Sequence, residues 1–323
     1  MSKVLNSIHG LALGDALGYI TERMRFKDII RMYGNDRELP GNKSLRISDD
    51  TQMSIALMQA VVKFEKHHPQ AVNKETRVDY IVDEFLNLTS AMELRGAGRA
   101  TVRSLSTLRA TDRSNPYIGS IADAKGSGTV MRSPWTGLGT IIEENELEEF
   151  SEKQSRITHG SPSAIHSAYL TALITKKLYT GELYCGGIFD FATDAANNPK
   201  VKDEGWSDIA MELEMVKSLP KEWASMHCDD IDPSGYIGYS GKGDTVLATA
   251  IAITDMFGED DPVYALRRGM LTGGDSDSIN ALVGGFVGAS HEDDIWSDMP
   301  LSLEPKYLEK MENIADFISQ GYL

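Results

Sequence analysis

The sequence contains few cysteines, and fewer basic than acidic residues. Among 323 residues there are only two cysteines, Cys185 and Cys228, and their spacing fits no metal site. This excludes a disulfide-stapled scaffold and favours a reducing compartment. The 48 acidic residues outnumber the 32 lysines and arginines, which gives a formal net charge of -16. Because an acidic surface repels phosphates, we expect no nucleic-acid partner.

Long apolar runs are also missing from the sequence. No stretch approaches the roughly 20 apolar residues of a membrane-spanning helix, and the first ten residues, MSKVLNSIHG, lack the apolar core of a signal peptide. Hydrophobic residues make up 41% of the chain and charged residues 25%, as in ordinary globular proteins. We therefore expect a cytoplasmic protein without a membrane partner.

The most frequent pattern in the sequence is the helical spacing of apolar residues. Apolar side chains recur at helical spacing in residues 52–64, 164–178, 245–257 and 278–289. Segments of alternating, strand-like character are scarce, and there is no internal repeat or long low-complexity linker. The pattern predicts an all-α protein in which residues 1–323 form one compact domain, with a monomer as the default state.

Two short acidic segments carry most of the chemical information. Residues 46–51 contain Ser48-Asp49-Asp50, and residues 273–278 contain Asp275-Ser276-Asp277-Ser278. Carboxylates and hydroxyls are the ligands that hard divalent cations such as Mg²⁺ and Mn²⁺ prefer. A plain helix cap explains each segment equally well, because Ser48 is a good N-cap and acids in a first turn complement the helix dipole. Other adjacent acids, such as Asp260-Asp261, show that such a pair is not diagnostic.

Glycines accompany the second acidic segment. Gly284, Gly285 and Gly288 lie inside the helix predicted after the second acidic segment. Glycine lowers helix stability, so their presence predicts close helix–helix packing there. Asp275 and Asp277 would then lie beside a buried core, where a cation would neutralise charges that are costly to bury. The alternative is a solvated helix cap.

Two further segments are candidates for ligand binding. Residues 126–132 lack the third glycine of a dinucleotide fingerprint, and they are either a plain turn or a source of backbone N–H groups for a pyrophosphate. His159 has either a structural or a catalytic role. No Walker A motif or catalytic triad is evident, and residues 10–18 predict a tightly packed N-terminal helix with one acid.

Taken in order, these motifs resemble those of the ADP-ribosylglycohydrolase family over about residues 8 to 290. The motifs that carry the resemblance are Gly14-Asp15-Ala16-Leu17-Gly18, Ser48-Asp49-Asp50-Thr51, residues 126–132, Thr158-His159 and residues 273–278. Ser48-Asp49-Asp50 and Tyr239-Ser240-Gly241, followed by Gly243-Asp244, are most similar to the ADP-ribosylarginine hydrolases. The resemblance implies a compact single-domain orthogonal helical bundle with two divalent metal ions, Mg²⁺ or Mn²⁺.

The resemblance also implies roles for individual residues. The metal ligands would be Ser48, Asp49, Asp50, Asp275, Asp277 and Ser278. The substrate-binding residues would be Gly126, Ser127, Gly128, Thr129, Met131, Arg132, His159, Ser240, Gly241 and Gly243. Asp49 or Asp50 would orient the attacking water. From their positions in loops, we expect Glu22 or Asp244 to hold the leaving group.

The reaction implied is hydrolysis of the glycosidic bond between ADP-ribose and a modified protein side chain, with arginine as the expected acceptor. The partner would be an ADP-ribosylated protein and the product ADP-ribose. Ser161 stands where a histidine often follows in the family, and Glu22 resembles an acid of the serine-specific branch. Alternatives are a catalytically silent ADP-ribose-binding relative, a hydrolase of serine-linked or other ADP-ribosyl conjugates, and a two-metal phosphohydrolase of free nucleotides.

Overall fold

The computed structural model describes residues 2–34, 43–71, 73–90, 94–111, 113–198, 203–219, 240–299 and 301–320. Cys228 and Tyr239 lie outside these ranges. No helix in the described ranges is long and apolar enough to cross a membrane.

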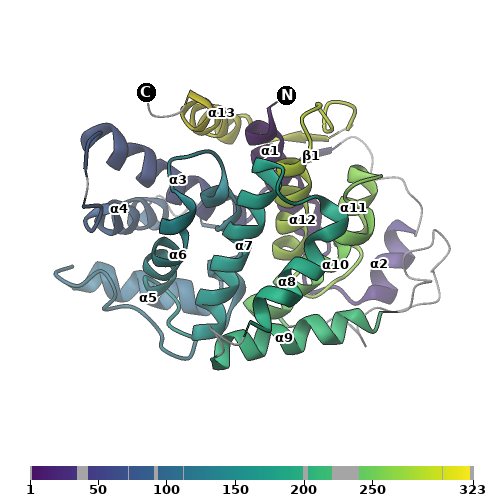
Figure 1. Cartoon of the computed structure of the whole chain (residues 1–323), viewed down its shortest axis with the longest axis horizontal. Coiled ribbons are helices and arrows are strands. Elements are labelled where there is room, and N and C mark those ends of the chain that lie inside the picture. The colour runs from purple at the N-terminus through teal and green to yellow at the C-terminus, as the bar shows by residue number, and fades with distance from the viewer. Residues whose placement is uncertain are drawn as a thin grey trace.

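The regular secondary structure of the described part of the chain is almost entirely helical (Figure 1). Its α-helices are α1 (Lys3–Gly18), α2 (Phe26–Tyr33), α3 (Asp49–His67), α4 (Arg77–Ser90), α5 (Arg99–Ala110), α6 (Leu147–Arg156), α7 (Pro162–Thr180), α8 (Ile188–Ala196), α9 (Glu204–Lys217), α10 (Gly243–Phe257), α11 (Pro262–Met270), α12 (Ser276–Ser290) and α13 (Pro305–Gln320). Short 3₁₀ turns are η1 (Ser127–Thr129), η2 (Pro134–Gly137), η3 (Glu144–Glu146) and η4 (Cys185–Gly187). The all-α prediction is confirmed, and the four periodic segments lie inside α3, α7, α10 and α12.

One small sheet accompanies the helices. Strand β1 (Lys43–Leu45) pairs in parallel with β2 (Leu301–Leu303), so that Lys43 lies opposite Leu301. The pairing joins the segment before α3 to the segment before α13. These strands are too short for side-chain alternation to reveal them in the sequence.

Local sequence explains where the principal helices begin and end. Ser48 caps α3, and its hydroxyl accepts a hydrogen bond from the Asp50 N–H at 3.2 Å. Pro162 begins α7, where a missing N–H costs nothing, and Gly181 ends it at φ 77°, a conformation that favours glycine. Asp261 caps α11 through the Tyr264 N–H at 3.1 Å.

Helix α12 lies at the centre of the molecule, where it contacts α1, α7, α10 and α11 (Figure 1). All of its residues except the last are buried. The buried apolar side chains form one cluster that includes residues from Val4 in α1 to Ile318 in α13. Single-domain organisation of residues 1–323 stays a prediction, which this continuous core supports.

The backbones of α1 and α12 touch along an antiparallel contact. A Cβ atom at Gly10, Gly14 or Gly18 of α1 would overlap the carbonyl group of Gly284, Asn280 or Ser276, respectively, on α12. In the other direction, a Cβ atom at Gly284 or Gly288 would overlap the carbonyl group of Gly10 or Asn6. Glycine is therefore required on both helices by close approach. The contact places the last turn of α1 beside the first turn of α12.

Replacing Gly14 with alanine tests this contact. We expect Gly14→Ala to lower the free energy of unfolding by about 1–3 kcal/mol, the usual cost of overpacking. The loss should appear even though alanine is otherwise favoured over glycine in a helix by about 1 kcal/mol. Urea denaturation provides the measurement.

Gly98→Ala is the matched control, because a Cβ at Gly98 meets nothing within 4 Å and its φ is -62°. Because Gly98 is the N-cap of α5, where glycine is preferred to alanine, the control should lose only about 0.5–1 kcal/mol. Equal stability of the two variants would show that the α1–α12 contact tolerates a methyl group.

Candidate functional site

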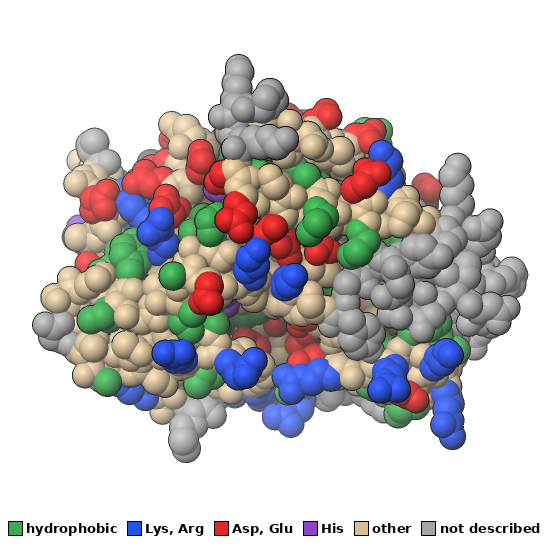
Figure 2. Space-filling model, turned by 90° about the horizontal axis from the view of Figure 1, so that it is seen from below, with side chains coloured by type: hydrophobic (Ala, Val, Ile, Leu, Met, Phe, Trp, Pro, Cys, Tyr) green, Lys and Arg blue, Asp and Glu red, His purple; other side chains and the backbone are tan. Residues whose placement is uncertain are grey.

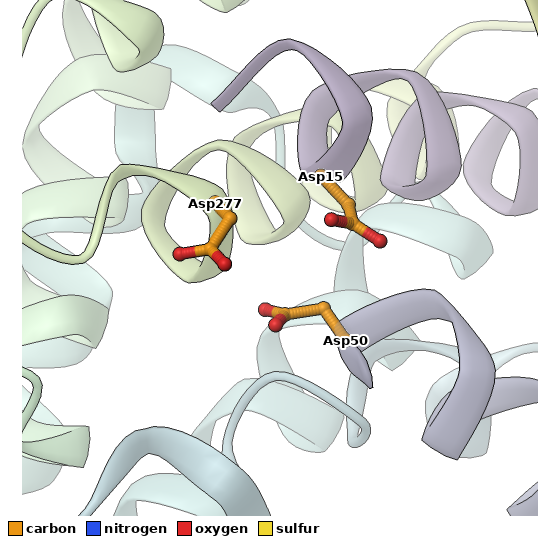
Figure 3. Close-up of side chains that lie close together, drawn as sticks. All are labelled: Asp15, Asp50 and Asp277. Atoms are coloured by element: carbon orange, nitrogen blue, oxygen red, sulfur yellow. The ribbon is translucent and has the colours of Figure 1, made fainter. Parts of the chain in front are cut away.

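Three helix ends bring carboxylates together. Asp15 lies in the last turn of α1, Asp50 in the first turn of α3 and Asp277 in the first turn of α12. All three are buried, and their nearest carboxylate oxygens lie within 4.8 Å of one another. Figure 3 shows the three side chains pointing into the space between their helices. The α1–α12 contact and the start of α3 therefore define this acidic cluster.

Asp15 holds the beginning of α3 in place. Its two carboxylate oxygens each accept a hydrogen bond from the Ser48 N–H at 3.0 Å. Its Oδ2 atom also accepts from the Thr51 N–H at 3.1 Å and from the Thr51 hydroxyl at 2.5 Å. Asp15 thus satisfies N–H groups that the first turn of a helix leaves without partners. Through these hydrogen bonds Asp15 positions the start of α3, and its carboxylate also belongs to the acidic cluster.

Sequence reasoning assigned no role to Asp15 in the metal site. The available signal was an acidic residue among the glycines of a tightly packed helix, with no basic residue in that helix's last turn.

The four carboxylates predicted as metal ligands line one cavity. Asp49, Asp50, Asp275 and Asp277 face a space of about 570 Å³ that Ser278 also lines. Ser48 is buried and donates a hydrogen bond from its hydroxyl to Asp50 Oδ2 at 3.0 Å. In Figure 2, acidic side chains are visible inside a hollow that is bordered by basic side chains. The two acidic segments, far apart in the sequence, thus meet in space.

The charges of these carboxylates are poorly compensated by the protein. Burial, followed by the neighbouring carboxylates, raises the pKa values of Asp49, Asp50 and Asp277 well above their usual range. Burial also raises the pKa of Asp15 to about 6, although its hydrogen bonds act in the opposite direction. Within the described ranges, no lysine or arginine forms an ion pair with Asp49, Asp50, Asp275 or Asp277.

A divalent cation fits this donor set. Asp50 Oδ1 and Asp275 Oδ2 are buried atoms without a hydrogen-bond partner. Unpaired buried acceptors are costly, so a ligand that binds both atoms would be stabilising. Carboxylate and hydroxyl oxygens are the donors preferred by Mg²⁺ and Mn²⁺.

A glycine loop forms one wall of the cavity. The Ser127 N–H donates to the Gly241 carbonyl at 2.9 Å, and the Gly243 N–H donates to the Lys125 carbonyl at 2.8 Å. The Ser278 hydroxyl lies 3.4 Å from the Ser127 hydroxyl, so the loop also contacts the first turn of α12. Of the residues predicted to bind substrate, those that line the cavity are Gly126, Ser127, Gly128, Met131, His159 and Gly241.

The remaining predicted substrate residues lie behind or beside this wall. They are Thr129, Arg132, Ser240 and Gly243, none of which lines the cavity. Thr129 is buried, and its hydroxyl donates to the Ala164 carbonyl at 2.9 Å. Ser240 is exposed, with its hydroxyl 3.3 Å from that of Thr245.

Arg132 and His159 shape the glycine loop from within the core. Arg132 is fully buried, and its Nη1 atom donates to the Gly128 carbonyl at 2.7 Å while Nη2 donates to the Thr158 hydroxyl at 3.0 Å. His159 Nδ1 lies 2.8 Å from the same hydroxyl. Burial and the Arg132 charge lower the pKa of His159 to about 3, so its ring is neutral at physiological pH.

The two acids predicted on the acceptor side occupy different places. Glu22 lines the cavity and pairs with Arg23 at 2.9 Å. Burial raises the pKa of Glu22. Asp244 is buried in the first turn of α10, where its Oδ2 atom accepts from the Ser163 hydroxyl at 2.6 Å and its Oδ1 from the Thr245 N–H at 2.8 Å. Asp244 is not among the cavity-lining residues.

Comparison with known proteins gives consistent matches. The family model described as ADP-ribosylglycohydrolase matches residues 1–320. ADP-ribosylhydrolase ARH1 of Dictyostelium discoideum is 26% identical, with 84% of this chain and 82% of that protein covered. ADP-ribosylhydrolase ARH3 of Xenopus tropicalis is 24% identical, with 94% and 91% covered.

Two further matches are informative. ADP-ribosyl-dinitrogen reductase glycohydrolase of Rhodospirillum rubrum is 34% identical over 50% of this chain, and the match spans 52% of that protein. A solved structure of an ADP-ribosylglycohydrolase-related protein complex has a TM-score of 0.70 at 19% identity, with 100% of this chain and 98% of that chain covered. The structural match shows that the fold is shared.

Cation binding should appear as a change in stability. We expect Mg²⁺ or Mn²⁺ at about 100 times its dissociation constant to add about 2.7 kcal/mol to the free energy of unfolding. A variant with Asp50→Asn and Asp277→Asn should lose this gain. In EDTA the variant should be at least as stable as the unmodified protein, because buried repelling charges have been removed. Thermal denaturation with cation and with EDTA provides the measurement.

Asp260→Asn is the control, since Asp260 is exposed and should not affect the cation response. A full response in the double variant would contradict the proposed ligands.

The raised pKa values also predict a pH dependence in EDTA. A carboxyl group whose pKa is higher in the folded than in the unfolded protein binds more protons when folded, so stability falls as pH rises. For Asp15 the fall should occur between the unfolded value of 3.8 and the folded value of about 6. Denaturation at a series of pH values should show it, and saturating cation should reduce it. Because carboxyl groups with lowered pKa values, such as Asp203 and Glu304, act in the opposite direction, the contribution of Asp15 is the difference from an Asp15→Asn variant. A difference that does not change through this window would contradict the assignment.

Proposed function

The chain belongs to the ADP-ribosylglycohydrolase family, and we propose that it hydrolyses the N-glycosidic bond between ADP-ribose and an arginine side chain of a modified protein. The family assignment supports a glycohydrolase that acts on ADP-ribose linkages. The observation that carries the proposal is the meeting of Asp49, Asp50, Asp275 and Asp277 in one cavity beside a glycine loop. The names of the relatives from Dictyostelium and Rhodospirillum support the same reaction class.

The cavity has two chemically different regions that suit the two ends of ADP-ribose. The loop of residues 126–128 and Gly241 would face the diphosphate and adenosine, because backbone N–H groups, other than that of Ser127, could bind phosphate without adding basic side chains. The acidic floor would face the distal ribose, whose hydroxyl groups match a site rich in oxygen ligands. A Cβ atom at Gly241 would lie 2.8 Å from Asp275 Oδ2, so a larger residue there would displace the Asp275 carboxylate.

We propose two divalent cations, Mg²⁺ or Mn²⁺, held by Asp49, Asp50, Asp275 and Asp277 with the hydroxyls of Ser48 and Ser278. When bound, such ions would supply positive charge that fixes the ribose hydroxyls and orders the acidic floor. Asp15 would contribute indirectly, by holding Ser48 and Thr51 at the start of α3.

The protein's own groups account for the remaining chemistry. The bond from the anomeric carbon to the arginine nitrogen breaks, and a bond to a water oxygen forms. Asp49 or Asp50 would orient that water and accept its proton, and the carboxylates would stabilise an oxocarbenium-like transition state. The departing guanidine takes up a proton and leaves as a cation. Of the two acceptor-side acids, Glu22 lines the cavity and is placed to hold that cation.

Serine-linked ADP-ribose is the second candidate substrate. One observation favours it: Glu22, which resembles an acid of the serine-specific branch, lines the cavity, whereas the Asp244 carboxylate is bound to Ser163. We further propose that the protein acts as a monomer in the cytoplasm on ADP-ribosylated proteins. The small number of cysteines supports the location.

Turnover of defined conjugates tests the proposal. Arginine-linked and serine-linked ADP-ribosyl peptides should be incubated with the protein in Mg²⁺, Mn²⁺ or EDTA, and the products identified by mass spectrometry. We expect free ADP-ribose from the arginine-linked peptide only when a divalent cation is present. Asp49→Ala combined with Asp50→Ala should lower the rate by at least about 10²–10⁴-fold, because it removes a general base and cation-binding groups.

The alternatives give different results. Release of ADP-ribose from the serine-linked peptide alone would show that the acceptor residue is serine and not arginine. A product containing AMP would indicate a phosphohydrolase. Binding of ADP-ribose without turnover of either peptide would indicate a silent relative. Circular dichroism of the double variant separates loss of chemistry from loss of folding.

A further inference from the structure

One edge of the cavity is basic, although the protein as a whole is strongly acidic. Helix α5 contains three arginines and no acidic residue, and α2 with the turn before it contains four basic residues and two acids, Glu22 and Asp28. We define the basic band as Arg23, Arg25, Lys27, Arg31, Arg99 and Arg103. Figure 2 shows basic side chains in a row along the lower border of the hollow.

The side chains of the basic band are available to a partner. All six are exposed. Arg23 pairs with Glu22, but within the described ranges the other five form no ion pair. Two other exposed arginines are paired, Arg113 with Asp83 and Arg156 with Glu152. The band therefore presents positive charge that the described part of the protein does not neutralise.

The band is attached firmly to the acidic floor. The Arg23 N–H donates to the Gly274 carbonyl at 2.7 Å, next to Asp275. Arg23 has a φ of 64°, a left-handed conformation that is uncommon for residues other than glycine. Arg99 lines the cavity directly, and Arg103 follows one turn later on the same face of α5.

Most of the band lies outside the space that ADP-ribose would fill. Only Arg23 and Arg99 line the cavity of about 570 Å³. Arg25 and Arg31 instead border a neighbouring hollow of about 560 Å³, which shares Arg23 with the cavity. Basic side chains around the entrance of the cavity are suited to bind the part of a protein substrate that remains outside the cavity.

From these observations, and resting on the proposed function, we propose that the basic band binds acidic side chains that flank the modified residue of the ADP-ribosylated protein. Complementary charges at an interface steer association and select partners. The band would make substrate proteins with acidic surroundings the preferred ones, and it would counter the long-range repulsion that they meet from a protein of net charge -16.

Apolar side chains within the band support a protein partner. Met32 on α2 is 63% exposed and Val102 on α5 is 48% exposed, and both are among the few large apolar side chains that are so exposed in the described part of the chain. An apolar contact bordered by charged groups is typical of protein–protein interfaces. A nucleic acid would meet repulsion from the acidic remainder of the surface at distances beyond the band.

Charge reversal on the band tests the proposal. The test variant carries Arg25→Glu and Arg103→Glu, which keeps both cavity-lining arginines. The control carries Lys306→Glu and Lys310→Glu on α13, which lies at the top of Figure 1, away from the face in Figure 2. Both variants change the net charge equally. Three arginine-linked conjugates are compared: a peptide with acidic flanking residues, the same peptide with the corresponding amides, and ADP-ribosylarginine.

We expect the unmodified protein to prefer the acidic peptide to the amide peptide by about tenfold in kcat/KM at low ionic strength, with the preference falling as salt is added. The test variant should lose this preference and keep its activity on ADP-ribosylarginine. The control variant should retain both. Equal kcat/KM for the two peptides with the unmodified protein would overturn the proposal.

Two further outcomes also overturn it. If the test variant loses activity equally on ADP-ribosylarginine, the band contacts ADP-ribose itself. If the unmodified protein binds a single-stranded oligonucleotide more tightly than the acidic peptide, and the test variant does not, the partner is a nucleic acid.

The proposed function can fail separately from this proposal. If no conjugate is hydrolysed, the affinities of the protein for the two uncleaved peptides, measured by fluorescence anisotropy, still test whether the basic band binds acidic side chains. A preference of about tenfold for the acidic peptide that the test variant lacks would support the band. Equal affinities would reject it.

Discussion

The backbone contact between α1 and α12 determines where the acidic groups of this protein lie. Only glycine on facing turns lets the two helices come so close, and the contact places Asp15 beside the first turn of α12. Asp15 then accepts the free N–H groups at the start of α3, which sets the position of Asp49 and Asp50. The close packing of α1 and α12 therefore determines the positions of carboxylates on three helices, α1, α3 and α12.

The acidic cluster shows a conflict between stability and function. Helices α3 and α12 both direct their N-termini, which carry partial positive charge, toward the cluster. Even so, burial and mutual repulsion dominate, and the pKa values of Asp49, Asp50 and Asp277 are raised. The protein holds carboxylates in a place where they are unfavourable without a counter-charge. Such an arrangement is typical of a site preorganised for a cationic ligand.

Much of the fold could be predicted from the sequence, because helical periodicity and caps such as Ser48 are local signals. The glycines also predicted close packing. What could not be predicted depends on contacts between distant elements. Glu22 and Asp244 both looked suited to the acceptor side, but Ser163 of α7 engages the Asp244 carboxylate while Glu22 lines the cavity. The capping role of Asp15 and the β1–β2 pair likewise arise only once distant segments meet.

The α1–α12 contact limits how early the protein can fold during its synthesis. Gly18 and Ser276, which touch where the two helices join, are 258 positions apart in the chain. At the usual elongation rate of about 5–20 residues per second, the first helix waits roughly 13–50 s for its partner. During that interval the glycine face of α1 has no surface to pack against, and Asp15 has no neighbour across the cluster. A ribosome-bound chain therefore cannot assemble the acidic floor until nearly the whole polypeptide has emerged.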